Sequence, residues 1–165
     1  MTPLDLVVTP WGARFLGRRF ACSIGRSGVT NRKREGDGAT PIGTHRIIGM
    51  LYRADRMTAP ADWARPIGPF DLWSDDPSDP DYNLPVTTPH GFSHERMHRA
   101  DPMYDLVMLT DWNWPHAQEG DGSAIFIHQW RGPVRATAGC VALAREDLRW
   151  IAQRWQHKSR LIIRG

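Results

Sequence analysis

The apolar residues of this chain fall into short runs separated by glycine and proline, and this spacing limits the folds open to it. The runs at 4–8, 20–24 and 161–164 have the length and the apolar pattern of β-strands. Glycine and proline number 15 and 13 of 165 residues, a high share that favours turns. A helical bundle needs several long stretches of helical periodicity, and the chain has one. We therefore expect a mostly β fold, formed as a single domain over residues 1–165.

The remaining segments divide into clear strands, one helix and a long irregular stretch. The runs at 44–52, 105–110 and 123–129 predict strands, of which the last two are apolar enough to be buried on both faces. A helix is predicted at 145–155, where four apolar side chains recur at helical spacing: Leu148, Ile151, Ala152 and Trp155. Residues 53–103 are rich in proline and acids and show little periodicity. We expect a long loop there with a functional role.

Charge and apolar run length exclude several classes of partner. The formal net charge is +3, and the basic residues are dispersed rather than interleaved with aromatics, so we expect no nucleic-acid partner. No apolar run is long enough to span a membrane, and the first residues lack the pattern of a secretory leader. The two cysteines are too few for a disulfide scaffold. Cys22 shares a strand face with Phe20 and Ile24, which predicts a small buried side chain.

Residues 94–98 match the zinc-peptidase pattern H-E-x-x-H. Zinc binding requires both imidazoles on one face of a helix, a third ligand and an open position for water. Pro89 and Pro102 flank the motif, the usual long apolar helix is missing, and only the loop residues His116 and Glu119 offer a third ligand. Three interpretations remain: a catalytic zinc site, a short polar surface helix, or a non-metal role lining a cleft.

A histidine and a cysteine form the second candidate site. His128 ends the apolar run at 123–129, and Cys140 follows a glycine shortly before the helix. We expect nearby helix-terminal amides to lower the pKa of the thiol. The N–H groups of Ala138, Gly139 and Cys140 are expected to form an oxyanion hole. An imidazole on a neighbouring strand can accept the thiol proton without a metal. A structural alternative, a buried cysteine beside a core histidine, stays open at this point.

The order of these motifs resembles the catalytic signature of the YkuD-type L,D-transpeptidase family, in which a histidine, a variable loop and Ser/Thr-x-Gly-Cys follow one another. The matching stretches here are 122–129 and 137–148. Further segments resemble the family and its compact proteobacterial branch in the same order: 34–44, 93–95, 104–106 and 111–113. The likeness runs from about residue 5 to residue 165, which is nearly the whole chain.

The resemblance implies a β-sandwich with one main helix after the catalytic cysteine, and acyl transfer between stem peptides of peptidoglycan. By position, Cys140 attacks a donor carbonyl, His128 acts as base and then acid, and the amine of a meso-diaminopimelate acceptor resolves the thioester. Gln129 holds the position whose backbone carbonyl orients the histidine in relatives. The resemblance implies neither a cofactor nor a metal. In the compact branch, Ser-His-Glu recurs without a role in zinc binding, so His98 is expected to complete the H-E-x-x-H pattern by chance. Carbapenems, whose strained carbonyl mimics the donor, are expected to acylate the cysteine.

The chain departs from the commonest family pattern beside the cysteine. Ala138 stands where many relatives have histidine, and Ala142 stands where many have arginine. The loop between His128 and Cys140 is also short, so the donor is expected to be either diaminopimelate-3 or L-alanine-1, giving 3–3 or 1–3 cross-links. The residues expected to bind substrate are Thr137, His94, Glu95, Tyr104, Trp112 and Trp130.

Location, assembly and competing functions complete the expectations. Because peptidoglycan lies outside the cytoplasmic membrane, we expect the protein to act in the periplasm or cell envelope. We also expect it to be a monomer. A cell-wall hydrolase using the same Cys–His pair is the main alternative. A zinc peptidase and a catalytically silent glycan-binding module with stacking tryptophans are the others. Thiol reactivity separates them, since neither a zinc site nor a binding module has reason to activate Cys140.

Overall fold

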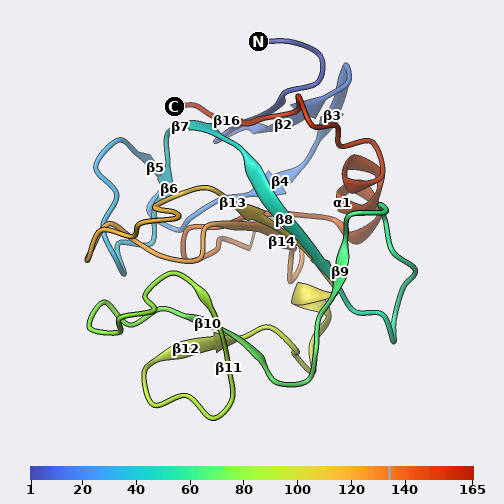
Figure 1. Ribbon diagram of the computed structural model, residues 1–165. Helices are drawn as coiled ribbons and strands as arrows, with labels where there is room; N and C mark the ends of the chain where they lie inside the picture. Colours follow the sequence, from blue (N-terminus) through green and yellow to red (C-terminus); the bar gives the residue numbers. More distant parts are fainter. Residues whose placement is uncertain (134) are drawn as a thin grey trace.

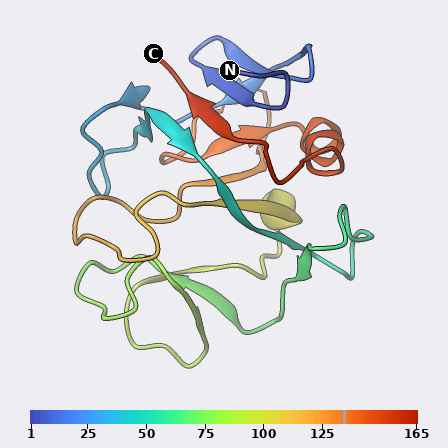
Figure 2. The ribbon, with the colours of Figure 1, turned by 45° about the horizontal axis from the view of Figure 1, so that its top comes forward.

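Three β-layers and one helix make up the computed structural model, which describes residues 1–133 and 135–165. Figure 1 shows a sheet near both termini, a second sheet through the middle of the molecule and a small third sheet below it. The helix lies at one end of the first two layers, and the view in Figure 2 keeps the same order of layers.

The strands form two large sheets and two small ones. The five-stranded sheet has the order β3 (Arg18–Phe20), β2 (Gly12–Phe15), β1 (Leu6–Thr9), β16 (Leu161–Ile163) and β7 (Gly43–His45). The six-stranded sheet has the order β4 (Cys22–Ser23), β15 (Val141–Leu143), β14 (Phe126–Gln129), β13 (Leu106–Thr110), β8 (Ile47–Tyr52) and β9 (Arg65–Pro66). The three-stranded sheet has the order β11 (Pro85–Thr87), β10 (Asp71–Ser74) and β12 (His94–Arg96). A further pair joins β5 (Val29–Thr30) to β6 (Thr40–Pro41), and the helices are α1 (Arg145–Ala152) and the 3₁₀ turn η1 (Pro102–Tyr104).

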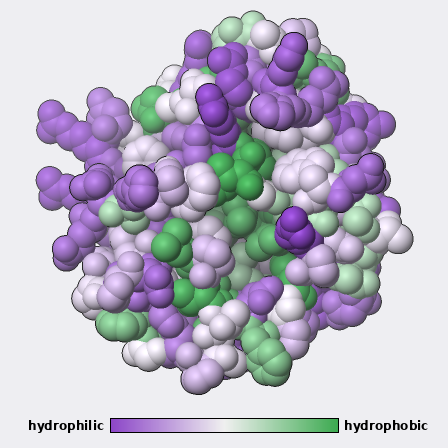
Figure 3. Space-filling model, in the orientation of Figure 1, coloured by the Kyte–Doolittle hydropathy of each residue, from purple (hydrophilic) through white to green (hydrophobic). Residues whose placement is uncertain are grey.

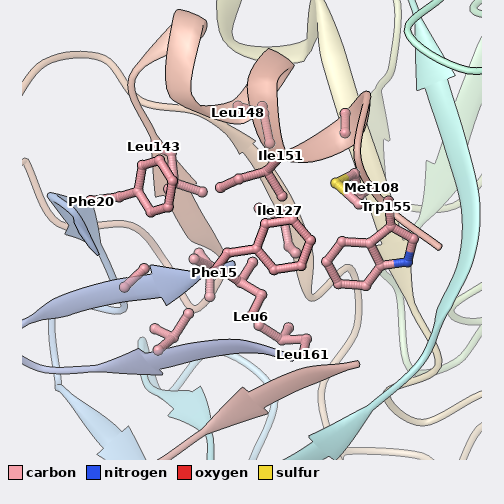
Figure 4. Close-up of a cluster of buried hydrophobic side chains, with 14 of the residues drawn as sticks. Leu6, Phe15, Phe20, Met108, Ile127, Leu143, Leu148, Ile151, Trp155 and Leu161 are labelled. Carbon is pink, nitrogen blue, oxygen red and sulfur yellow. The ribbon is translucent and has the colours of Figure 1, made fainter. Parts of the chain in front are cut away.

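The main hydrophobic core lies between the two large sheets and is closed by α1 (Figure 4). Leu6 and Phe15 reach it from the five-stranded sheet, Ile127 from the six-stranded sheet, and Leu148 and Ile151 from the helix. All five side chains are fully buried or nearly so, and burying each contributes about 1.5–3 kcal/mol. The first and last strands of the chain are joined in this layer, because β1 pairs in parallel with β16.

The opposite face of the six-stranded sheet is buried as well. All five residues of β13 are buried, and they alternate between the main core (Leu106, Met108) and a second cluster (Val107, Leu109). Trp73 of the three-stranded sheet packs edge-on against Phe126 of β14, with ring centroids 5.0 Å apart. The third layer therefore acts as a cover for the second face of the six-stranded sheet.

The mostly β fold, the sandwich and the single main helix after Cys140 are confirmed. Residues 53–103 were expected to form a long loop, but the structure places strands β9 to β12 and the start of η1 in this segment. Its strands have two to four residues, which is too short to show a periodic pattern in the sequence. β10 lies in the middle of the three-stranded sheet because it pairs with both β11 and β12. Cys22 packs against the main core as expected, and burial raises the pKa of its thiol to about 11.

The outer surface is mainly hydrophilic, with hydrophobic side chains gathered in the middle of the face shown in Figure 3. In the described parts of the chain, no helix has both the length and the apolar character needed to cross a bilayer.

Candidate active site

A pocket of about 360 Å³ opens where the six-stranded sheet meets the segment that carries the third layer. Its lining includes His128 and Cys140, together with Thr137, Ala138 and Ala142 of the cysteine segment and Trp130 of the preceding loop. The covering segment contributes four further side chains: Glu95, Arg99, Met103 and Tyr104. With Arg26 from the N-terminal part of the chain, the pocket is built from three segments that are distant in sequence.

Strand pairing brings the histidine and the cysteine together. β14 and β15 run in parallel, and the register places His128 opposite Ala142. Cys140 lies two positions before Ala142, so its side chain emerges on the same face as that of His128. The small side chain of Ala142 leaves room for the pocket between them.

The sulfur of Cys140 is held by two backbone groups of the segment leading into β14. Its thiol donates a hydrogen bond to the carbonyl of Ala124, with Sγ and O 2.9 Å apart. The N–H of Phe126 donates to Sγ at 3.3 Å. These two bonds orient the thiol toward the Ala124 carbonyl.

His128 is fixed in the tautomer that a general base requires. Its Nδ1 lies 2.8 Å from the carbonyl oxygen of Gln129, which can only accept, so Nδ1 carries the proton and Nε2 keeps its lone pair. The ring of Tyr104 packs edge-on against the imidazole, with centroids 5.3 Å apart. The role expected for the Gln129 backbone is thus consistent with the geometry.

The turn before the cysteine depends on Gly139 and Thr137. Gly139 has a φ of 149°, and a Cβ added there would meet the Ala39 carbonyl oxygen at 3.0 Å, so a larger residue would displace the turn. Thr137 Oγ1 accepts from the N–H of Gly139 at 3.1 Å and donates to the carbonyl of Cys140 at 2.6 Å. Thr40 Oγ1 donates to the Gly139 carbonyl at 2.7 Å and anchors the turn from the other side.

These bonds divide the three N–H groups expected to form an oxyanion hole. The N–H of Gly139 is engaged by Thr137, whereas those of Ala138 and Cys140 have no hydrogen-bond partner among the described residues. Ala138 and Cys140 therefore hold the donors available to a developing oxyanion, and Gly139 orients the turn.

The expected activation of Cys140 by helix-terminal amides is wrong. β15 separates the cysteine from α1, which begins only at Arg145. Burial, together with the nearby carboxylate of Glu95, instead raises the pKa of the thiol to about 12. Burial also lowers the pKa of His128 to about 4, so at neutral pH the resting pair is a neutral thiol and a neutral imidazole.

This pairing predicts an unusually broad pH profile. We expect kcat/KM for the donor, which reports acylation, to stay level at neutral and mildly acidic pH and to fall about tenfold per unit only below about pH 4, where His128 takes up a proton and ceases to be a base. The measurement is kcat/KM against pH, with circular dichroism at each point to separate titration from unfolding. An acidic limb centred near 6.5, the ordinary histidine value, would contradict it.

Glu95 and Tyr104, both expected to bind substrate, meet in the pocket. The Tyr104 hydroxyl donates a hydrogen bond to Oε2 of Glu95. Sequence reasoning missed the arginines of the lining, which are Arg26, Arg99, Arg131 and Arg135. They come from three separate segments, with Arg131 and Arg135 in the same loop between β14 and β15, and no local signal distinguishes them from the other dispersed arginines.

Two of the expected substrate-binding residues lie elsewhere. His94 is absent from the pocket lining, and its Nδ1 lies 2.7 Å from the carbonyl of Phe92. Trp112 packs against His45 and donates to the carbonyl of Asp121. Neither side chain reaches Cys140 in this structure.

The H-E-x-x-H segment forms no helix. His94 and Glu95 belong to β12, so the interpretation as a short surface helix is wrong. β12 ends at Arg96 and a bend follows at residues 97 and 98, so the two histidines do not lie one helical turn apart as the zinc-peptidase pattern requires. Among the described residues, no cluster of three or more histidine, cysteine or acidic side chains could hold a metal.

A larger cavity of about 690 Å³ lies away from this pocket, lined by Ile47, Trp63, Trp155 and Lys158 among others. It includes His157 and Ser159, but neither cysteine. The smaller pocket, which joins a thiol to a histidine of fixed tautomer, is therefore the candidate active site.

Comparison with models of known protein families identifies the family of this chain. The family model described as the L,D-transpeptidase catalytic domain, YkuD, matches residues 12–163. The chain belongs to this family. Among solved structures, an L,D-transpeptidase from Mycobacterium smegmatis is similar at 14% identity and a TM-score of 0.46, covering 98% of this chain and 58% of that chain. The comparison with curated proteins found no match.

Proposed function

We propose that this YkuD-family chain is a peptidoglycan L,D-transpeptidase in which Cys140 is the nucleophile and His128 the general base. The observation that carries the proposal is the arrangement of the pair: both line one pocket from adjacent strands, and the Gln129 carbonyl leaves Nε2 of His128 unprotonated. A histidine in that tautomer can take the thiol proton and later return it.

In the proposed reaction, His128 removes the proton of Cys140 as the sulfur attacks a carbonyl of the donor stem peptide. The N–H groups of Ala138 and Cys140 bind the oxyanion, and the donor's leaving group departs with the proton from His128. The amine of a diaminopimelate acceptor then attacks the thioester and releases the cysteine. We place the protein in the periplasm or cell envelope, where this substrate lies, as a monomer with one catalytic domain over residues 1–165.

The cross-link formed tests this function and its main alternative. Purified protein would be incubated with defined monomeric muropeptides, and the products sequenced by fragmentation mass spectrometry. A 3–3 dimer with release of D-alanine identifies diaminopimelate-3 as donor, and a dimer lacking the stem beyond L-alanine identifies L-alanine-1. Cleaved monomers without any dimer would replace the proposal with a hydrolase that uses the same Cys–His pair.

The environment beside Cys140 favours a donor pocket unlike that of the commonest relatives. Ala138 and Ala142 both line the pocket, so the histidine and arginine of the common pattern have no counterpart at these positions. Losing one charged contact to a donor carboxylate costs about 1.5–3 kcal/mol of preference. The 1–3 product therefore stands beside the 3–3 product in the proposal.

A further inference from the structure

Glu95 has no task in the proposed first half of the reaction. It is the one acidic side chain among the described residues that line the pocket. Its carboxylate raises the pKa of the Cys140 thiol, an effect that hinders formation of the thiolate. An anion beside a nucleophilic cysteine must therefore be explained by a step other than thiol activation.

The side chain is held in place as part of a small network. β12 carries Glu95 and pairs it with Trp73 of β10, in the middle of the covering sheet. Oε2 accepts the hydrogen bond from Tyr104, whose ring packs against the imidazole of His128. Oε1 has no hydrogen-bond partner in the part of the chain that the structure describes, so one carboxylate oxygen is fixed and the other is available to a ligand.

The charges around Glu95 define what it attracts. Four guanidinium groups share the lining: Arg26, Arg99, Arg131 and Arg135. Arg99 is paired with Asp101, which lies outside the lining, and the remaining guanidinium groups favour carboxylates. Glu95 is the lining side chain among the described residues whose charge attracts an ammonium group. A ligand that carries an ammonium next to a carboxylate, as a free amino-acid centre does, matches this distribution.

We propose that Glu95 binds the ammonium group of the incoming acceptor and takes its proton, with Tyr104 positioning the carboxylate. This inference rests on the proposed transpeptidase function, because it concerns the second half of that reaction. The acceptor class it names is an amine attached to a carbon that also bears a carboxylate.

The protons and bonds of the step balance. The acceptor arrives as R–NH₃⁺, and Glu95 takes one proton, which later passes to water. The neutral amine forms a C–N bond to the thioester carbon, and the C–S bond breaks. His128 takes the second proton from the attacking nitrogen and delivers it to the departing sulfur of Cys140. The third proton remains on the new amide.

The burial of Glu95 suits this exchange. Burial raises the pKa of its carboxyl group above the ordinary value, opposed by the hydrogen bond from Tyr104 and the charge of Arg99. A carboxylate of raised pKa is a stronger base toward an ammonium than one in water.

The test measures how the acyl-enzyme divides between transfer and hydrolysis in Glu95→Gln, which keeps the shape and a partner for Tyr104. We expect the ratio of dimer to hydrolysed monomer to fall about 10²-fold. Acylation of Cys140, followed by mass spectrometry with a carbapenem, should be no slower than in the unmodified protein, because the anion beside the thiol is gone.

A neutral nucleophile provides the sharpest comparison. Methoxyamine is uncharged at neutral pH, so it needs neither an ammonium site nor a base to become nucleophilic. We expect the acyl-enzymes of the unmodified protein and of Glu95→Gln to react with it at equal rates. Glu35→Gln is the matched control, since Glu35 also accepts from a tyrosine hydroxyl, that of Tyr82, and lies outside the pocket lining.

Two results would overturn the proposal: an unchanged transfer ratio in Glu95→Gln, or equal losses with methoxyamine and the ammonium acceptor, which would indicate a structural role. Glu95→Asp keeps the charge and is expected to retain most of the transfer, which separates lost chemistry from lost folding. If the unmodified protein makes no dimer with any acceptor, the transpeptidase function itself is wrong, a result distinct from both.

Discussion

Cys140→Ala is expected to abolish formation of both acyl-enzyme and cross-linked product. No other nucleophile lines the described pocket in a position equivalent to the sulfur, since the hydroxyl of Thr137 is engaged by the carbonyl of Cys140. The substitution leaves the carbonyl of Ala124 and the N–H of Phe126 without the sulfur, at a cost of about 1–3 kcal/mol each, which lowers the stability and leaves the buried core unchanged. The measurements are dimer yield by mass spectrometry and thermal unfolding.

Cys22→Ala is the matched control for this variant. Cys22 packs against the main core and pairs with Leu143 at the edge of the six-stranded sheet, away from the pocket lining. Activity should be kept in Cys22→Ala, and a carbapenem should add one drug mass to it but none to Cys140→Ala. An adduct that persists in Cys140→Ala, or activity lost with modification of Cys22, would remove Cys140 from the nucleophile's role.

His128→Ala is expected to lower the rate of acylation by about 10²–10⁴. The thiol has a pKa of about 12, so at neutral pH the thiolate is scarce and the loss of the base is not made up by spontaneous ionisation. The pre-steady-state rate of acyl-enzyme formation is the appropriate readout, because it isolates the step in which His128 takes the thiol proton.

His45→Ala serves as the histidine control. His45 is buried in β7 beside Trp112 and has a lowered pKa caused by burial, as His128 does, but it lies outside the pocket. Its loss should reduce stability without lowering the acylation rate of folded protein. A loss below about tenfold in His128→Ala would mean that another group removes the thiol proton.

Local sequence was enough to predict most of the scaffold. The apolar run at 123–129 and the helical spacing after residue 144 specify elements whose side chains all point to one or two buried faces, so periodicity alone reveals them. The pairing of His128 with Cys140 was also predicted, because the two residues belong to motifs whose order resembles a known family.

The electrostatics of the site were not predictable in this way. The pKa of Cys140 depends on how completely it is covered and on the carboxylate of Glu95, which is 45 positions earlier in the chain. Because Cys140 is close to the helix in sequence, its pKa was expected to be lowered, whereas the structure raises it. Three residues of strand between the cysteine and α1 remove the effect of the helix terminus, since that effect fades within about one turn.

The sequence therefore predicted the β-rich fold and its helix from short-range patterns, and motif order singled out Cys140 and His128 as the residues proposed to be nucleophile and base. Only the tertiary structure decided which side chains share the pocket. Glu95, Tyr104 and Arg99 reach it because β12 and η1 are folded over one face of the six-stranded sheet, while His94, next to Glu95, remains outside. Strand pairing between distant segments sets those positions, and neighbouring residues of one strand point to opposite faces, so a shift of one residue separates a pocket residue from a surface one.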